Sequence, residues 1–297
     1  MAFPREVQKR IIGDSLHTQE RESSYALEMR LSHLKDLAHL VATHLIETTD
    51  QPLLEALGEL STHLMPPDET ALHREALPAN RQALKGALSA LSRFDGAMLC
   101  HFLAQHMEAA GQPIMAEQLL PITTHFDLIA CPSNSYATTA YTELLSDMAS
   151  PYFVGDYREA ISATRAGECD GCLVPFRDGE GEALTPFRKQ LFSAGLLVSQ
   201  VLSVQGRTHS AMELALCGRY LLPIEEGATW LLSLTTPTAL PRLLDMAAYL
   251  GFTPTSVTQE GETIVSLIGE GDPIPLLISI HLFCREARVV GSYIHTR

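Results

Sequence analysis

Two cysteines three positions apart, in the stretch ECDGCLVPFRDGEGE, have the spacing of a metal or redox motif. Cys169 and Cys172 form this Cys-x-x-Cys pair. A structural zinc site needs a second pair of ligands, and the nearest histidines in the sequence, His125 and His209, belong to no such pair. We therefore expect no metal here and interpret both cysteines as small buried apolar side chains. Any chemistry of this stretch is expected in the polar loop PFRDGEGE that follows.

The composition excludes several classes of protein. With 297 residues, 46% of them hydrophobic, the chain can bury a large core and is expected to fold as two or three domains. A net charge of −14 and a pI near 5.2 would repel a phosphate backbone, so no nucleic-acid partner is expected. No apolar run reaches the roughly 18 residues of a membrane span, and no signal-peptide core follows the N-terminal charges. We expect a cytoplasmic protein that does not bind membranes.

Residues 1–120 are predicted to form a helical domain. Apolar residues within 26–47 recur three and four positions apart, which places them on one face of an amphipathic helix. Two adjacent prolines, Pro66 and Pro67, interrupt the pattern, and residues 83–111 resume it until Gly111 supplies a stop.

Residues 121–227 are predicted to form an α/β domain. Strands are expected at 126–132, 152–155, 172–176 and 196–204, with helices between them at 136–149, 156–167 and 184–195. The middle helix should begin at an Asp156 N-cap and end at Gly167. Right-handed crossovers in this βαβαβαβ order predict a parallel sheet, with ligands bound at the carboxyl ends of its strands.

Residues 228–297 are predicted to form a third, smaller domain. Strands are expected at 228–236, 252–259, 262–269 and 287–294, and helices at 239–251 and 275–284. This βαββαβ order is the ferredoxin-like split arrangement. Trp230 is expected in its core. The fold class is thus α+β multidomain, and we expect the third domain to pair two subunits in a homodimer.

Three stretches resemble the bifunctional chorismate mutase/prephenate dehydratase (P-protein) family. Residues 126–141, FDLIACPSNSYATTAY, resemble the opening of the dehydratase domain, whose first strand runs into a Gly-Pro-x-Gly-Thr-x-Ser turn. Residues 157–184 resemble the next dehydratase motif, and residues 288–297, RVVGSYIHTR, are similar to the end of the regulatory ACT domain. The helical N-terminal region then resembles the chorismate mutase domain. The resemblance implies phenylalanine biosynthesis, no cofactor, and a small aromatic or carboxylate ligand.

The resemblance also implies two candidate sites and one regulatory turn. In the helical domain, the residues that match the mutase site in spacing are Arg30, Arg74, Glu75 and Gln105. In the α/β domain, the dehydratase positions fall on Ser135, Tyr136, Arg177 and Asp178. The turn that binds a regulatory ligand in ACT domains falls on Ala239 and Leu240.

The motifs depart from the family at residues that carry its chemistry. Cys131 and Asn134 replace the two glycines of the first turn, and residues 177–179, Arg-Asp-Gly, replace a Glu-Asn-Ser. The family's Thr-Arg-Phe, whose Thr assists departure of the substrate hydroxyl, is replaced at 228–230 by Ala-Thr-Trp. Residues 204–230 leave room for about one helix and one strand, where the family has a second lobe.

Two main hypotheses follow. The first is a divergent enzyme of phenylalanine biosynthesis that converts chorismate to prephenate or prephenate to phenylpyruvate. The second is a catalytically inactive regulatory or scaffolding homologue that dimerises and binds a small aromatic acid. A third alternative is an α/β ligand-binding lobe unrelated to chorismate.

Overall fold

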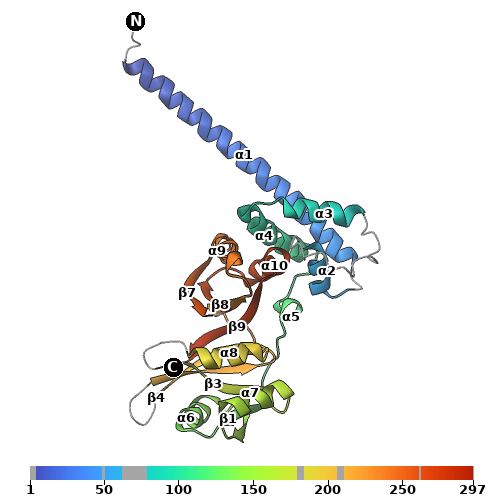
Figure 1. Cartoon of the computed structure of the whole chain (residues 1–297). Coiled ribbons are helices and arrows are strands. Elements are labelled where there is room, and N and C mark those ends of the chain that lie inside the picture. The colour runs from blue at the N-terminus through green and yellow to red at the C-terminus, as the bar shows by residue number, and fades with distance from the viewer. Residues whose placement is uncertain are drawn as a thin grey trace.

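The computed structural model describes six stretches of the chain: residues 5–48, 51–61, 79–178, 184–205, 211–260 and 262–296. They form a mixed α/β structure in which helices cover one large sheet (Figure 1). Within the described residues, no helix combines the length and apolar character that crossing a bilayer requires.

The N-terminal part consists of helices. They are α1 (Arg5–Glu47), α2 (Leu53–Leu60), α3 (Ala79–Ser89), α4 (Arg93–Ala109) and α5 (Ala116–Leu119). Helix α1 begins at Arg5, well before the predicted residue 26, and its first half projects from the rest of the molecule (Figure 1). In its second half, Leu34, Leu37 and Val41 are buried on one face, as the apolar periodicity predicted. Leu27 and Leu40 were predicted on the same face, but both are exposed.

The rest of the chain forms a sheet with helices on its faces. The described strands are β1 (Leu128–Pro132), β2 (Ser150–Val154), β3 (Gly171–Arg177), β4 (Leu197–Gln205), β5 (Ala211–Gly218), β6 (Thr229–Leu234), β7 (Phe252–Glu260), β8 (Glu262–Gly269) and β9 (Ala287–Thr296), in the order β2-β1-β3-β5-β4-β9-β6-β8-β7. The helices are α6 (Ser135–Ala140), η2 (Tyr141–Leu145), α7 (Tyr157–Ala166), α8 (Thr185–Ser193), η3 (Pro237–Ala239), α9 (Leu240–Tyr249) and α10 (Pro273–Phe283).

The prediction of a parallel sheet in the α/β part is only half right. Strands β2, β1 and β3 are parallel, but β5 lies antiparallel between β3 and β4. Strand β4 ends at Gln205 and β5 begins at Ala211, and so short a connection can join only antiparallel strands. The described part of the segment after Val204 therefore holds the strand β5, and no helix is seen in residues 211–227.

The two faces of the α/β part carry separate cores. Helices α7 and α8 cover one face, where Ile161 and Leu191 pack with Val174 of β3. Helix α6 and η2 cover the other face, where Ala137 packs with Leu173, the neighbour of Val174. Successive strand residues point to opposite faces, so β3 contributes to both cores. The caps of α7 are as predicted: the Asp156 side chain accepts hydrogen bonds from the first turn, and Gly167 closes the helix with φ +83°.

The C-terminal part has the predicted βαββαβ element order. Its strands β9-β6-β8-β7 pair antiparallel, and β9 also pairs in parallel with β4, which joins this part to the α/β part in one continuous sheet. Trp230 is 3% exposed, so it is a core residue as expected.

Helices α9 and α10 lie between the C-terminal strands and α4 (Figure 1). One hydrophobic cluster includes Leu103 of α4, Leu243 of α9 and Phe283 of α10. The helical N-terminal part and the C-terminal part therefore share one core. The division into 1–120, 121–227 and 228–297 stays a prediction.

Candidate ligand site at the carboxyl edge of the sheet

The predicted mutase residues are not gathered in one place. Arg30 of α1 contacts Asp95 in the first turn of α4. Gln105 lies ten residues further along α4, is exposed, and pairs with His101 at 3.0 Å. Arg30 is held at Asp95, and the ten residues of α-helix from Asp95 to Gln105 span about 15 Å. Arg30 and Gln105 are therefore too far apart to bind one small substrate together. Residues 74 and 75, Arg and Glu, lie outside the described residues.

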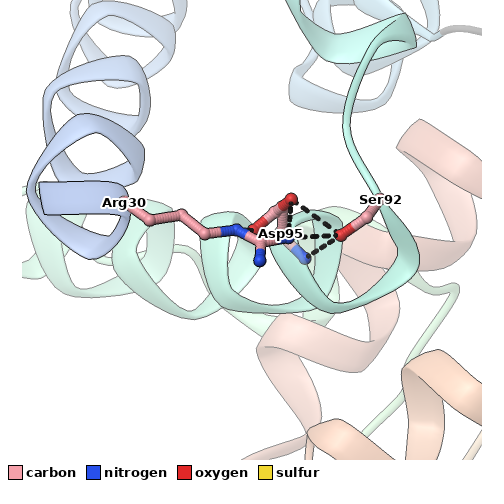
Figure 2. A network of polar contacts seen from close by, with 3 residues as sticks. All are labelled: Arg30, Ser92 and Asp95. Atoms are coloured by element: carbon pink, nitrogen blue, oxygen red, sulfur yellow. Dashed lines mark hydrogen bonds and ion pairs between the residues drawn. The ribbon is translucent and has the colours of Figure 1, made fainter. Parts of the chain in front are cut away.

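The guanidinium group of Arg30 is hydrogen-bonded to Asp95 and Ser92 at the start of α4. Its Nε and Nη2 each donate to one carboxylate oxygen of Asp95 at 2.6 Å, and Nη2 also donates to Ser92 Oγ at 3.1 Å (Figure 2). Ser92 donates to Asp95 Oδ2 at 2.7 Å and accepts from the Asp95 N–H. Burial acts to raise the pKa of Asp95, but the hydrogen bonds from Arg30 and Ser92 outweigh it and hold that pKa below its usual value. This network ties α1 to the start of α4.

The predicted dehydratase residues, in contrast, come to one edge of the sheet. Strands β1 and β3 are parallel neighbours, so their carboxyl ends lie side by side. Ser135 and Tyr136 open α6 directly after β1, and Arg177 and Asp178 lie where β3 ends. Helix α6 leaves toward one face and α8 toward the other, which makes this edge a topological switch point. Open α/β sheets bind their ligands at such points.

We call this place the β1/β3 edge and define it by residues 133–136, 157 and 177–178. Sequence reasoning missed two of its residues, Asn134 and Tyr157. Asn134 Oδ1 accepts the hydrogen bond of the Ala137 N–H at 3.0 Å, and the Asn134 side chain is also hydrogen-bonded with the Tyr157 hydroxyl.

Tyr157 is held in place by its surroundings. It is the first residue of α7, at the carboxyl end of β2, and its ring packs edge-on against Phe187 of α8 at 5.4 Å between centroids. Burial raises the pKa of the Tyr157 hydroxyl above its usual value, and the hydrogen bond with Asn134 only partly offsets this. The hydroxyl is thus protonated at neutral pH and can serve as a hydrogen-bond donor.

Arg177 supplies positive charge at the same edge. Its Nη1 lies 3.4 Å from Glu213 Oε2, and Glu213 Oε1 lies 3.9 Å from His295 Nδ1 at the end of β9. The Arg177 side chain is 24% exposed, so part of it faces solvent. Among the described residues, Glu213 is the carboxylate that pairs with Arg177, and one such partner leaves an arginine with donors for a second anion.

Aromatic rings and a second arginine lie behind Arg177. Arg188 of α8 is buried with its guanidinium 4.4 Å from the centroid of the Phe176 ring, and Tyr293 of β9 packs edge-on against the same ring at 5.8 Å. Burial raises the pKa of Tyr293, although the charges of Arg177 and Arg188 act in the opposite direction. These contacts fix Phe176 and so the end of β3.

The neighbouring N-terminus of α7 is already occupied by acidic side chains. Asp156 Oδ1 accepts from the N–H groups of Arg158 and Glu159 at 2.8 and 2.9 Å, and Glu159 Oε2 accepts from the Gly155 N–H at 2.6 Å. An anionic ligand would meet two carboxylates here. The arrangement at this edge therefore favours an anion beside Arg177 rather than at the N–H groups of the first turn of α7.

The cysteine pair behaves as the sequence predicted. Cys169 and Cys172 are 2% and 0% exposed, and burial raises the pKa of Cys172 to about 12. Among the described residues, no three His, Cys, Asp or Glu side chains are placed to hold a metal ion.

Ala239 and Leu240, the predicted regulatory turn, lie at the start of α9, where Ala239 is buried in the core shared with the helical part.

Comparison with known proteins gives few matches. No protein-family model and no curated protein matches the chain. Among solved structures, a prephenate dehydratase from Streptococcus mutans is 19% identical with a TM-score of 0.43, covering 58% of this chain and 100% of its own. A prephenate dehydratase from Arthrobacter aurescens in complex with L-Phe is 12% identical with a TM-score of 0.44, covering 56% of this chain and 89% of its own.

A third solved structure has a different activity. GqqA, described as a novel type of quorum-quenching acylase, is 16% identical with a TM-score of 0.40, covering 57% of this chain and 95% of its own. The matched structures thus include dehydratases, which the sequence motifs resemble, and a protein described as an acylase.

Proposed function

We propose that the chain binds a small aromatic carboxylate at the β1/β3 edge and that its helical part does not rearrange chorismate. The observation that carries the proposal is the position of Tyr157 with Asn134, and of Arg177, where neighbouring parallel strands end at a topological switch point. A cation and a neutral hydroxyl donor are the groups that recognise a carboxylate. The ring of such a ligand would find Phe187 beside Tyr157.

The ion pair between Arg30 and Asp95 argues against chorismate mutase activity in the helical part. Rearrangement of chorismate needs cationic groups that clamp two carboxylates and stabilise the breaking ether bond. Arg30 already makes a bidentate ion pair with Asp95, so a substrate carboxylate would have to displace a carboxylate of the protein. The helical part is better explained as a structural support for α9 and α10.

The finer proposals rest on the sequence resemblance. We place the chain near the chorismate mutase/prephenate dehydratase proteins, as a relative with an ACT-like βαββαβ part in residues 228–297. In this proposal that part pairs two copies as a homodimer, and the turn at Ala239 and Leu240 is a second place for a small ligand. The buried thiols of the six cysteines fit a cytoplasmic setting.

One observation favours a second candidate, a dehydratase with a new proton donor. Prephenate loses CO₂ and a hydroxide together: the carboxylate carbon–carbon bond supplies the electrons that complete the aromatic ring, and the leaving oxygen takes up a proton. Tyr157 has a neutral hydroxyl whose proton can be donated at the β1/β3 edge. It could replace the threonine that the family uses.

The test is to incubate the full chain with chorismate and, separately, with prephenate, and to follow prephenate and phenylpyruvate by NMR. The proposal expects saturation transfer to prephenate and phenylpyruvate without turnover of either substrate. Tyr157→Phe should weaken binding, whereas Tyr152→Phe, on the exposed face of β2, should not. Formation of phenylpyruvate that Tyr157→Phe abolishes would replace this proposal with the dehydratase. Formation of prephenate from chorismate would overturn the structural role of the helical part.

A further inference from the structure

The carboxylate of Glu213 lies between two basic side chains that come from different parts of the chain. Its Oε2 is 3.4 Å from Arg177 Nη1 at the end of β3, and its Oε1 is 3.9 Å from His295 Nδ1 near the end of β9. The exposed fractions of the three side chains lie between 23% and 39%, so solvent reaches all of them. One carboxylate therefore connects the β1/β3 edge with the last strand of the C-terminal part.

The pairing of four strands places these side chains together. The register between β3 and β5 shifts just before Arg177 and brings it directly opposite Glu213. Val201 of β4 pairs with Ala215 of β5 on one side and with His295 of β9 on the other. Alternate residues of a strand share a face, so His295 lies on the face of Ala215 and Glu213. The contact is therefore set by the sheet rather than by a loop.

The groups around the His295 imidazole differ in how they respond to acid. Tyr293 of the same strand packs edge-on against it at 5.3 Å between ring centroids, and burial raises the pKa of the Tyr293 hydroxyl, which therefore stays neutral. Arg177 of β3 and Arg188 of α8, whose charges reach that hydroxyl, carry guanidinium groups, which stay charged in proteins. An imidazole, in contrast, gains its positive charge between about pH 8 and pH 5. Acid therefore changes the charge on one side of Glu213 and not on the other.

A charged imidazole attracts the same carboxylate as Arg177 does. The attraction draws the Glu213 carboxylate toward β9 and so weakens its hold on the Arg177 guanidinium. More of the guanidinium donors are then available to the anion of a ligand. Because partly exposed ion pairs are weak, the change in ligand affinity should be a few-fold rather than many-fold.

We propose that His295 is a positioning residue for the β1/β3 edge: through Glu213, it sets how freely Arg177 binds the carboxylate of the ligand. This inference rests on the function proposed above for that edge. Ligand affinity then depends on pH with a definite sign, because it rises as acid charges the imidazole. The C-terminal part thus influences binding through a side chain that acts on Glu213 and not on the ligand.

The experiment is a titration of the full chain with phenylpyruvate, by isothermal titration calorimetry at about pH 8 and at about pH 5.5. The carboxylate of phenylpyruvate stays ionised over this range. Wild type should bind about threefold more tightly at the lower pH. His295→Gln keeps a polar side chain that takes up no proton, so its affinity should be equal at the two pH values. His125→Gln is the matched control and should keep the wild-type dependence, because His125 also pairs with a carboxylate, Asp127 at 3.1 Å, but lies near the amino end of β1.

Glu213→Gln tests the route from His295 to Arg177. Without this carboxylate, the imidazole has no ion pair to weaken, so the affinity of Glu213→Gln should not change with pH. A pH dependence that persists in this variant would show that His295 acts on the ligand directly, which overturns its role as a positioning residue. Circular dichroism at both pH values checks that each variant is folded.

The remaining outcomes separate this inference from the proposed function. Phenylpyruvate binding whose affinity is independent of pH in wild type, or still dependent on pH in His295→Gln, would overturn this inference alone. Absence of phenylpyruvate binding at both pH values would overturn the proposed function, and this inference with it.

Discussion

The two places where the sequence predicted catalysis differ in what their polar groups already bind. In the helical part, the guanidinium of Arg30 is bonded to Asp95 and Ser92 of the same chain. At the β1/β3 edge, the raised pKa of the Tyr157 hydroxyl keeps it protonated, and Arg177 makes a longer ion pair with Glu213, at 3.4 Å. The first network stabilises the fold, and the second leaves donors for a ligand.

The difference follows from where the groups lie in the fold. Arg30 and Asp95 hold two helices side by side, so their pairing is needed whenever the protein is folded. Tyr157 and Arg177 lie where strands end and backbone direction changes, and the strands rather than these side chains hold the surrounding structure. When strands hold the surrounding structure, polar side chains at their ends are not needed for its stability and can contact a ligand.

The largest expected effect is on stability, from Asp95→Ala. This change removes the carboxylate that caps α4 and pairs with Arg30, so the free energy of unfolding should fall by about 1–2 kcal/mol. Urea denaturation measures it. Ligand affinity at the β1/β3 edge should stay within about twofold of wild type, because the two regions share no partners.

Asp245→Ala is the control for this prediction. Asp245 pairs with Arg93 on the surface, with both side chains about half exposed, so its loss should cost less than about 0.5 kcal/mol. Equal destabilisation by the two variants would show that the Asp95 network is no more than a surface ion pair. The distinction between the two regions would then fail.

The next effect is on binding, from Arg177→Gln. Loss of the cation should weaken phenylpyruvate about tenfold, while stability changes by less than about 1 kcal/mol because the pair with Glu213 is partly exposed. Isothermal titration calorimetry measures the affinity. Arg165→Gln, an exposed arginine at the end of α7, is the matched control.

Glu213→Gln sharpens the same comparison. Removing this carboxylate leaves Arg177 without its competing anion, so the affinity for phenylpyruvate should stay equal or rise. A loss as large as that of Arg177→Gln would mean that the ion pair itself, rather than a cation open to ligand, matters at this edge.

Local patterns were sufficient to predict much of the fold. The Asp156 cap, the Gly167 stop and the βαββαβ order each depend on residues close in sequence, and the structure contains all three. The position of β5 depends on pairing between strands that the pattern does not encode, so the parallel sheet was wrong in this respect. A short polar segment between two apolar runs, 206–210, was the signal for a hairpin.

The site was predictable only in part. Ser135 and Arg177 could be placed at the ends of strands from sequence, and strand order then brought them to one edge. The contact between Arg30 and Asp95 joins residues 65 positions apart, which periodicity cannot indicate. Tyr157 could have been found, because it follows the predicted cap Asp156 at the end of a predicted strand, where ligands of α/β sheets bind.

The smallest expected effect is a pH dependence of stability confined to the helical side. Burial lowers the pKa of His44 in α1 and of His281 in α10 below the usual 6.5, and nearby Arg81 and Arg285 act in the same direction on His44 and His281 respectively. His44 Nε2 is buried without a hydrogen-bond partner among the described residues. Protonation would place a charge in this core.

The sign follows from linkage. The folded pKa values lie below 6.5, so the unfolded chain binds more protons in that range, and the stability these histidines contribute is present above pH 6.5 and lost as pH falls through their folded pKa values. Denaturation midpoints measured from about pH 8 down to about pH 5 should fall, and His44→Gln together with His281→Gln should flatten the slope. His101→Gln, on α4, should leave it unchanged. The Tyr157 hydroxyl, whose pKa is raised, stays protonated over this range, so its contribution to binding at the β1/β3 edge should stay constant as long as the chain is folded. If ligand affinity and stability fall together with pH in the double variant, the helical side and the β1/β3 edge do not respond to acid independently.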